Sequence, residues 1–255
     1  MNILISNDDG ITAEGIQFLA SAMRAAAHNV FVFAPSGNRS AVSNAITMGK
    51  PFSIETVGEK DWAYSGTPAD CVIAAFKSGL ILEKIDAVFA GINNGANLGT
   101  DIIYSGTCAA ARQGALYRVP SVAFSIDFLD IQDGKATYYK RMADFAVKNV
   151  QKLVNLAEKM EGRAFLNVNA FALPQWKGAR ISKCLAHRCY HNDGVRLVEE
   201  KDDGTLCAEF VGNKPQTKKM CESDFALCEA GFVSVSCVQV EPNCYEVVDD
   251  FSFSL

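Results

Sequence analysis

Apolar strand-like segments and amphipathic helix-like segments alternate along the first two thirds of this chain, and that alternation limits the folds open to it. A short apolar run at residues 2–6 is followed by a segment at 14–27 whose apolar residues recur at helical spacing, and then by a second apolar run at 30–34. Strand, helix and strand in close succession form a βαβ unit. Such a unit predicts parallel strands joined by a right-handed crossover.

The same alternation continues along the chain. A further helix is expected to start at Thr67-Pro68, because proline favours the first helical position. The remaining helices of this region are expected near 107–117 and 137–160, and the remaining strands at 86–90, 121–125 and 164–169. We therefore predict an α/β fold with a three-layer α/β/α, Rossmann-like arrangement, in which about five mostly parallel strands lie between two layers of helices.

After about Pro174 the pattern becomes rich in strands. The segment GVRLVEEKDDGTLCAEFVG at 194–212 predicts a hairpin that turns at Asp202-Asp203-Gly204. The tail beyond it is also β-rich and ends in apolar residues, which indicates an arm that packs on another subunit. The predicted fold therefore carries a β-rich C-terminal extension.

The chain reads as one domain, since no low-complexity linker and no repeat interrupts it. We expect a single domain over 1–255, with the α/β core and the active site at 1–175 and a hairpin and C-terminal arm for oligomerisation at about 176–255.

The balance of charged and apolar residues excludes several kinds of partner. The formal net charge is −5 and the pI is near 5.3, whereas binding to a nucleic-acid polymer relies on a basic surface. No apolar run approaches the roughly 20 residues of a membrane-spanning helix. The amino terminus has neither the basic segment nor the small-residue cleavage site of a secretion signal. We expect a cytoplasmic protein that binds neither a membrane nor a nucleic-acid polymer, and a single nucleotide held through a metal stays allowed.

Nine cysteines are scattered without paired CxxC spacing, which favours reduced thiols. Cys184, His187, Cys189 and His191 form one cluster of side chains that are able to bind zinc. Their spacing matches no zinc finger, and on a strand Cys184 would point away from the other three. A structural zinc site is therefore the less favoured interpretation.

Polar, glycine-bearing loops follow three of the predicted strands. Asn7-Asp8-Asp9-Gly10 follows the first strand, PSGNRSAVSN at 35–44 follows the second, and GINNGANLGTDIIYSGT at 91–107 follows the strand at 86–90. Because the carboxyl ends of parallel strands meet at one edge of an open α/β sheet, we expect these loops to border a single crevice.

Asp8 and Asp9 place two like charges side by side at this edge. Their repulsion is relieved most simply by a hard cation, for which carboxylate oxygens are the preferred ligands. The alternative is that Asp-Asp-Gly only makes a turn, since Asp and Gly both favour tight turns.

The third loop combines amide and hydroxyl side chains with glycines. Asn93 and Asn97 offer amide groups, and Ser105-Gly106-Thr107 opens a helix. Hydroxyls together with the free N–H groups of a helix N-terminus form an anion site, and phosphate is a common occupant. Taken alone, Ser105 or Thr107 would only cap the helix. The agreement of the three loops favours a phosphate site.

Five segments of the chain resemble successive motifs of the SurE family of metal-dependent 5′/3′-nucleotidases. They are NDDGITAEGIQFL, APSGNRS, SGTPADC, AGINNGANLG and IYSGTCAAA, in the family's order and spacing, with weaker similarity at LNVN and DFALCEAGFVSVS. The resemblance implies one divalent cation, Mg²⁺ or Mn²⁺, bound by Asp8, Asp9, Ser40 and Asn93, and a substrate phosphate bound by Asn97, Ser105, Gly106 and Thr107. It also implies nucleoside 5′- and 3′-monophosphates, with short polyphosphates in addition, as substrates, and a homodimer or homotetramer assembled through the C-terminal region.

The sequence departs from the family pattern at three positions. Ala41 stands where the family usually has glycine, so the loop must accept a Cβ atom, at a cost if this position needs a positive φ. Phe171 and Cys237 stand where proline is usual. These two lie outside the predicted site and affect the C-terminal geometry.

The predicted reaction is hydrolysis of a phosphate monoester by a water activated at the metal. Asn97, Ser105 and Thr107 would position the phosphoryl oxygens, while Asp8 or Asp9 accepts a proton from the attacking water. No histidine is well placed to protonate the leaving group. Tyr64 and Tyr104 are candidates for stacking on a base, and Tyr104, beside the phosphate motif, is the better one.

Other interpretations of the acidic pair remain. In one, Asp8 or Asp9 is a nucleophile that forms an aspartyl-phosphate, but NDDGI lacks the DxDGT pattern of such phosphatases. In another, the chain is a non-catalytic phosphate- or nucleotide-sensing domain, although 50–57 lacks the phospho-accepting Asp of a receiver-like domain. A nicotinamide-binding domain is disfavoured because no GxGxxG follows the first strand.

Overall fold

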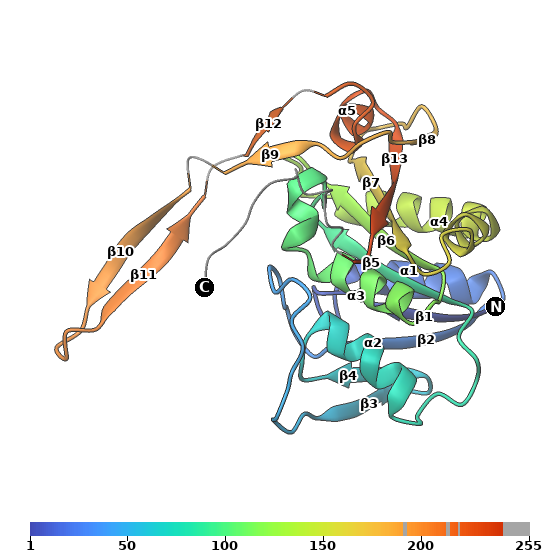
Figure 1. The fold of residues 1–255 in the computed structure, drawn as a ribbon, viewed down its shortest axis with the longest axis horizontal. Helices are drawn as coiled ribbons and strands as arrows, with labels where there is room; N and C mark the ends of the chain where they lie inside the picture. Colours follow the sequence, from blue (N-terminus) through green and yellow to red (C-terminus); the bar gives the residue numbers. More distant parts are fainter. Residues whose placement is uncertain (191–192, 213–214, 219, 242–255) are drawn as a thin grey trace, which may run out of the picture.

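The computed structural model describes residues 1–190, 193–212, 215–218 and 220–241. Its centre is a nine-stranded sheet with the strand order β3-β4-β2-β1-β5-β6-β7-β13-β8 and with helices on both faces (Figure 1). These strands are β1 (Asn2–Ser6), β2 (Asn29–Pro35), β3 (Ile54–Gly58), β4 (Asp61–Tyr64), β5 (Ala87–Asn94), β6 (Ser121–Asp127), β7 (Ala164–Phe171), β8 (Ala179–Ile181) and β13 (Val233–Gln239). The predicted three-layer, mostly parallel α/β fold is confirmed.

Six consecutive strands of the sheet, β4-β2-β1-β5-β6-β7, run parallel to one another. The sequence analysis missed β4, which adds a parallel strand beyond β2. With the sequence DWAY, β4 is too short to show a clear strand pattern, and it is held by pairing with β2 and, antiparallel, with β3. Local sequence cannot show that kind of stabilisation.

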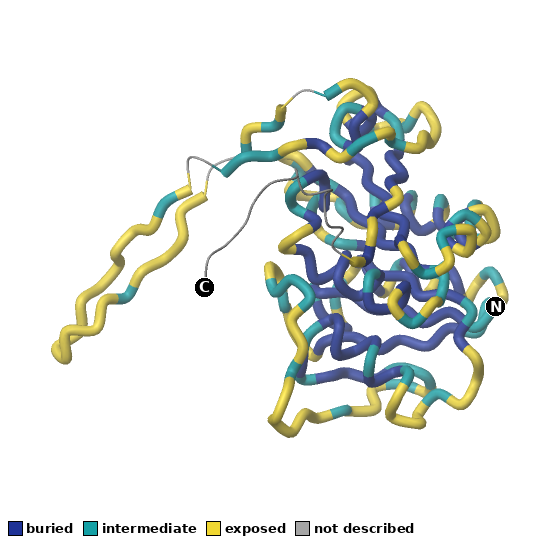
Figure 2. The backbone as a smooth tube through the Cα atoms, in the orientation of Figure 1, coloured by how far each residue is buried: buried dark blue, intermediate teal, exposed yellow. Residues whose placement is uncertain are grey.

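Alternate residues of β1 face the two different helix layers. Ile3 and Ile5 pack with α1 (Glu14–Ala25) and α4 (Lys135–Glu158), whereas Leu4 packs with α2 (Pro68–Lys77) and α3 (Gly106–Leu116). All three side chains are fully buried, and the buried parts of the tube in Figure 2 follow the sheet. Because both faces of the sheet are covered, its strands are apolar throughout rather than alternating with polar residues.

The helix α2 begins as the sequence predicts. Thr67 is its N-cap, and the hydroxyl of Thr67 accepts a hydrogen bond from the backbone N–H of Asp70 at 3.2 Å. The Asp70 carboxylate accepts in return from the backbone N–H of Thr67 at 2.9 Å, which completes a capping box, and Pro68 occupies the first helical turn.

The C-terminal extension leaves the core and then returns to it. It contains β9 (His187–Cys189), the hairpin of β10 (Gly194–Glu200) and β11 (Leu206–Val211), β12 (Gln216–Lys218) and α5 (Asp224–Glu229). The predicted hairpin is confirmed and projects away from the body of the protein (Figure 1). β13 then pairs antiparallel with β7 in the central sheet. The last part of the expected arm, residues 242–255, lies outside the described residues.

The described cysteines, which exclude Cys244, are free thiols. Of the cysteine and histidine cluster for which a zinc site was the less favoured interpretation, His187 and Cys189 lie on β9, while His191 falls outside the described residues. None of the described helices has the length and apolar character that crossing a membrane requires.

Candidate active site

The loops that follow β1, β2 and β5 border one pocket of about 190 Å³. Its lining includes five of the eight predicted metal- and phosphate-binding residues and the stacking candidate Tyr104. The full lining is Asp8, Ser40, Ala41, Asn93, Asn94, Asn97, Asp101, Tyr104, Ser105 and Tyr190. A cavity of about 440 Å³ around Met1 and Arg118 lies at the opposite ends of the strands and contains none of the predicted residues. The convergence of the loops is therefore as expected.

The turn after β1 is held by Asn7 and brings Asp8 to the pocket. The Asn7 side chain accepts from the N–H of Gly10 at 3.2 Å and donates to the carbonyl of Gly10 at 2.8 Å. The carbonyl of Asp8 accepts from the N–H of Arg39 at 2.7 Å, which ties the first loop to the second. Asp-Asp-Gly is thus a turn, as the alternative interpretation held, and this turn also presents the carboxylates.

Asp8 is a buried carboxylate. Burial is the main cause that raises its pKa to about 6, and the charge of Asp9 raises it further, while the hydrogen bond from the hydroxyl of Thr107 opposes the shift. Burial also raises the pKa of Asp9. The backbone N–H of Asn94 donates to Asp9 Oδ2 at 3.0 Å, and this hydrogen bond opposes the rise of the pKa. A positive charge at this position would stabilise both ionised groups.

Asn93 offers an amide oxygen to the same place. The pairing of β5 with β6 shifts register between Ala90 and Asn93, and such a shift re-aims the side chains that follow it. The Asn93 amide nitrogen donates to the carbonyl of Gly95 at 2.8 Å, and Asn93 Oδ1 lies 3.4 Å from Thr107 Oγ1. The oxygens of Asn93 and Asp8 therefore meet at the hydroxyl of Thr107.

Ser40 is exposed at the other side of the pocket, and its N–H donates to Asn38 Oδ1 at 2.8 Å. The next residue, Ala41, has φ +58°, so the position does need the left-handed conformation that favours glycine. The loop is held to the third loop by Ser43, whose N–H donates to the carbonyl of Tyr104 at 2.9 Å. The strained position is therefore two residues from a fixed point of the loop.

The start of α3 closes the pocket. Ser105 is the N-cap, and its hydroxyl accepts from the N–H of Cys108 at 3.0 Å, so Ser105 does cap the helix. The hydroxyl of Thr107 donates to Asp8, and the N–H groups of the first helical turn point out of the helix end. Gly106 packs directly on Asp8.

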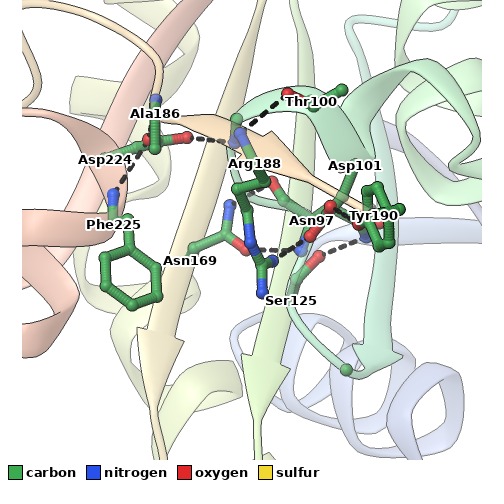
Figure 3. Close-up of polar contacts among 12 residues, drawn as sticks. Asn97, Thr100, Asp101, Ser125, Asn169, Ala186, Arg188, Tyr190, Asp224 and Phe225 are labelled. Atoms are coloured by element: carbon green, nitrogen blue, oxygen red, sulfur yellow. Dashed lines mark hydrogen bonds and ion pairs between the residues drawn. The ribbon is translucent and has the colours of Figure 1, made fainter. Parts of the chain in front are cut away.

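Asn97 is fixed by a buried polar network. Its amide nitrogen donates to Ser125 Oγ at 2.8 Å, and its backbone N–H donates to Asn169 Oδ1 at 2.8 Å (Figure 3). Its carbonyl accepts from the side chain of Asn167 at 2.7 Å. Asn167 and Asn169 were not predicted as part of the site. The sequence did carry a signal for them: the apolar strand LNVN contains two asparagines, and buried polar side chains need hydrogen-bond partners.

Three further residues near the pocket escaped the sequence analysis. Asp101 and Tyr190 line it, and Arg188 forms an ion pair with Asp101. Arg188 and Tyr190 come from the C-terminal extension, where no strand-end pattern marks them. Tyr104 lines the pocket as expected, but Tyr64 does not: Tyr64 is buried in β4 beside Phe33.

The chain is similar to known proteins over most of its length. Residues 3–191 match the family model described as Survival protein SurE. A protein of Acinetobacter baumannii (strain AYE) named 5′-nucleotidase SurE is 36% identical over 264 residues, covering 100% of each chain. A protein of the same name from Actinobacillus pleuropneumoniae serotype 5b (strain L20) is 38% identical over 247 residues, covering 94% of each. The crystal structure of the SurE protein from Aquifex aeolicus has a TM-score of 0.78 and 29% identity, and the match covers 95% of each chain.

The contact between Gly106 and Asp8 leaves no room for a side chain. A Cβ atom on Gly106 would lie 2.7 Å from the Cβ of Asp8 and 3.0 Å from Cγ of Pro68. We expect Gly106→Ala to lower the free energy of unfolding by about 1–3 kcal/mol, because overpacking outweighs the better helix propensity of alanine. Gly37→Ala is the matched control, since nothing lies within 4 Å of its Cβ position. Urea unfolding measures both, and equal stability of the two variants would contradict the close packing.

The raised pKa of Asp8 predicts a pH-dependent effect of Asp8→Asn. The pKa of Asp8 in the folded protein, about 6, lies above its ordinary value of 3.8. The protonated carboxyl therefore favours folding below pH 3.8, and this contribution is lost as the pH rises through 6. In chelator, Asp8→Asn should stabilise the protein by about 1–3 kcal/mol at pH 8 and much less at pH 4. Urea unfolding at the two pH values tests this. Asp202→Asn, in the exposed hairpin turn, is the control, and an Asp8→Asn effect that is the same at both pH values would refute the prediction.

Proposed function

This chain belongs to the SurE family, and we propose that it is a metal-dependent phosphomonoesterase that hydrolyses nucleoside 5′- and 3′-monophosphates to nucleoside and phosphate, with short polyphosphates as further substrates. The observation that carries the proposal is the meeting of Asp8 and Asn93 oxygens with the first turn of α3 in one pocket. A cation and a phosphate group would be neighbours there.

The side chains at the pocket suit a hard divalent cation. Asp8, Ser40 and Asn93 line the pocket, and Asp9 lies next to Asp8 and accepts from the N–H of Asn94. These four residues supply carboxylate, hydroxyl and amide oxygens, with no sulfur or imidazole among them, and such a set favours Mg²⁺ or Mn²⁺ over zinc. The buried charge of Asp8, whose pKa is raised, supports a positively charged partner. When bound, the cation would neutralise charge on the phosphoryl group and activate the attacking water.

The remaining steps fall to residues of the chain. The first-turn N–H groups of α3 that Ser105 does not cap and the fixed side chain of Asn97 orient the phosphoryl oxygens. The hydroxyl of Thr107, which donates to Asp8 in this structure, would join them by turning its hydrogen from Asp8 to the phosphate. Asp8 and Asp9 are both candidates to accept the proton of the attacking water. Of the described histidines, neither His28 nor His187 lines the pocket, and we propose water as the proton donor to the leaving alcohol.

The activity is tested by phosphate release from a panel of nucleoside monophosphates with Mg²⁺, with Mn²⁺ and with chelator. We expect metal-dependent release that Asp9→Asn reduces about a hundredfold or more, because it removes one charged oxygen ligand. Asp202→Asn serves as the matched control. The absence of release with either metal, from protein shown to be folded, would contradict the phosphatase and favour the alternative of a non-catalytic nucleotide-sensing domain, for which nucleotide binding without turnover is the expected result.

We also propose that 1–255 is one domain, with an α/β core at 1–175 and an extension at 176–255 through which two or four copies assemble. The pairing of β13 with β7 supports a single domain. One face of the hairpin supports the assembly, because Val195, Leu197 and Phe210 on it are 63%, 63% and 90% exposed. An isolated two-stranded hairpin with exposed apolar side chains is marginally stable unless something covers it.

A polar substitution on the hairpin tests this assembly. We expect light scattering after gel filtration to give a dimer or tetramer for the wild type and a smaller species for Phe210→Glu. Glu199→Gln, on the same hairpin, should leave the assembly unchanged. A monomeric wild type, or a Phe210→Glu protein of unchanged mass, would contradict the proposal.

A cytoplasmic location completes the proposal. The free thiols among the described cysteines fit a reducing compartment.

A further inference from the structure

A charged cluster borders the pocket on the side of the C-terminal extension (Figure 3). Asp101 lies in a short 3₁₀ helix, η1 (Gly99–Ile103), within the third loop. One carboxylate oxygen of Asp101 accepts from the hydroxyl of Tyr190, and the other accepts from the guanidinium of Arg188. The side chains of Arg188 and Asp101 are only 11% and 14% exposed, so this ion pair is largely removed from solvent.

The cluster mixes residues that reach the pocket with one that does not. Asp101 and Tyr190 line the pocket that holds Asp8 and Asn97, whereas Arg188 lies behind them. Among the described ion pairs, Arg188–Asp101 is the one that involves a carboxylate lining the pocket. Any effect of Arg188 on a ligand in this pocket would therefore pass through Asp101 and Tyr190.

Backbone hydrogen bonds hold the guanidinium of Arg188 beside Asp101. Asp224 is fully buried, and its two carboxylate oxygens accept from the N–H groups of Gly99 and Ala186, each at 2.7 Å. The N–H of Arg188 donates to Thr100 Oγ1 at 3.0 Å. These bonds hold β9 in fixed register against η1, so Arg188 meets Asp101 in one arrangement.

An uncompensated carboxylate at this place would oppose a phosphate ligand. Like charges several ångströms apart in a partly desolvated pocket repel strongly, because the effective dielectric constant is far below that of water. The pocket already receives the charge of Asp8, and a phosphate monoester would bring two further negative charges near neutral pH. Burial raises the pKa of Asp101, while the hydrogen bond from Tyr190 and the charge of Arg188 oppose that shift. Arg188 is the cation in contact with this carboxylate.

We infer that Arg188 is a positioning residue for phosphate binding: it neutralises Asp101 and, with it, holds Tyr190 as the wall of the pocket. The inference rests on the proposed phosphatase function for the identity of the anion. Tyr190 stands edge-on to Tyr104, with ring centres 6.4 Å apart, so the same cluster also sets the aromatic side of the pocket on which a nucleoside would lie.

The test compares four proteins: wild type, Arg188→Met, Asp101→Asn, and the double variant. The first readout is the dissociation constant of inorganic orthophosphate, measured by calorimetry at pH 8 with Mg²⁺. We expect Arg188→Met to weaken orthophosphate binding about tenfold, because it leaves the charge of Asp101 uncompensated. In the double variant the unpaired charge is gone, so binding should return to within about threefold of the wild type.

Turnover gives the second readout. With a nucleoside monophosphate as substrate, Arg188→Met should raise KM by a similar factor and change kcat much less, because the reacting groups are untouched. Arg188→Lys keeps the charge with a less favourable geometry and should fall between the wild type and Arg188→Met. Far-UV circular dichroism and the melting temperature of each variant show whether it is folded.

The outcomes separate this inference from the proposed function. Normal orthophosphate binding by Arg188→Met, or a double variant as impaired as Arg188→Met, overturns the role of Arg188, since a purely structural or directly binding arginine would not be rescued by Asp101→Asn. A wild type that binds orthophosphate but releases none from nucleotides overturns the phosphatase and leaves the binding test valid. A wild type that binds no orthophosphate overturns the inference as well.

Discussion

The candidate site depends on the packing of the first turn of α3 against Asp8. Gly106 has no side chain, so the helix end comes within contact distance of the carboxylate, and Thr107 donates its hydroxyl hydrogen to it. This contact joins the end of β1 to the end of the third loop, which are 99 residues apart in the chain. The proximity of a carboxylate and a helix N-terminus, on which metal-assisted phosphate chemistry would rely, follows from it.

A buried charge and strained backbone positions lie in the loops around this contact. Asp8 is buried with its pKa raised, and Ala41 and Ser43 adopt left-handed backbone conformations with φ +58° and +53°. Such features persist where neighbouring structure overdetermines them, and they gather at functional sites. Here the carbonyl of Asp8 is bonded to the N–H of Arg39, and Ser43 is bonded to the third loop, so the strained segment has fixed ends.

Buried polar side chains connect the pocket to strands of the central sheet. Asn97 is held by Ser125 on β6 and by Asn167 and Asn169 on β7. None of these side chains is among the described buried groups that lack a hydrogen-bond partner, and a satisfied buried network makes a structure specific rather than unstable. β7 in turn pairs with β13, so the return of the C-terminal extension to the sheet supports the site from behind.

Much of the fold and the centre of the site were readable from the sequence. The alternation of apolar runs and helical periodicity determined the α/β class, because this signal is local in the chain. The strand-end loops and their motifs pointed to Asp8, Asn93 and Asn97, which the structure brings to one pocket, and to Thr107, which donates to Asp8. Only the tertiary structure decided that DWAY is a strand and that the hydroxyl of Ser105 accepts from a backbone N–H of α3 as a helix cap. It also decided that Arg188 and Tyr190 both donate to Asp101. Those facts depend on strand pairing and register between distant segments, which short-range patterns do not encode.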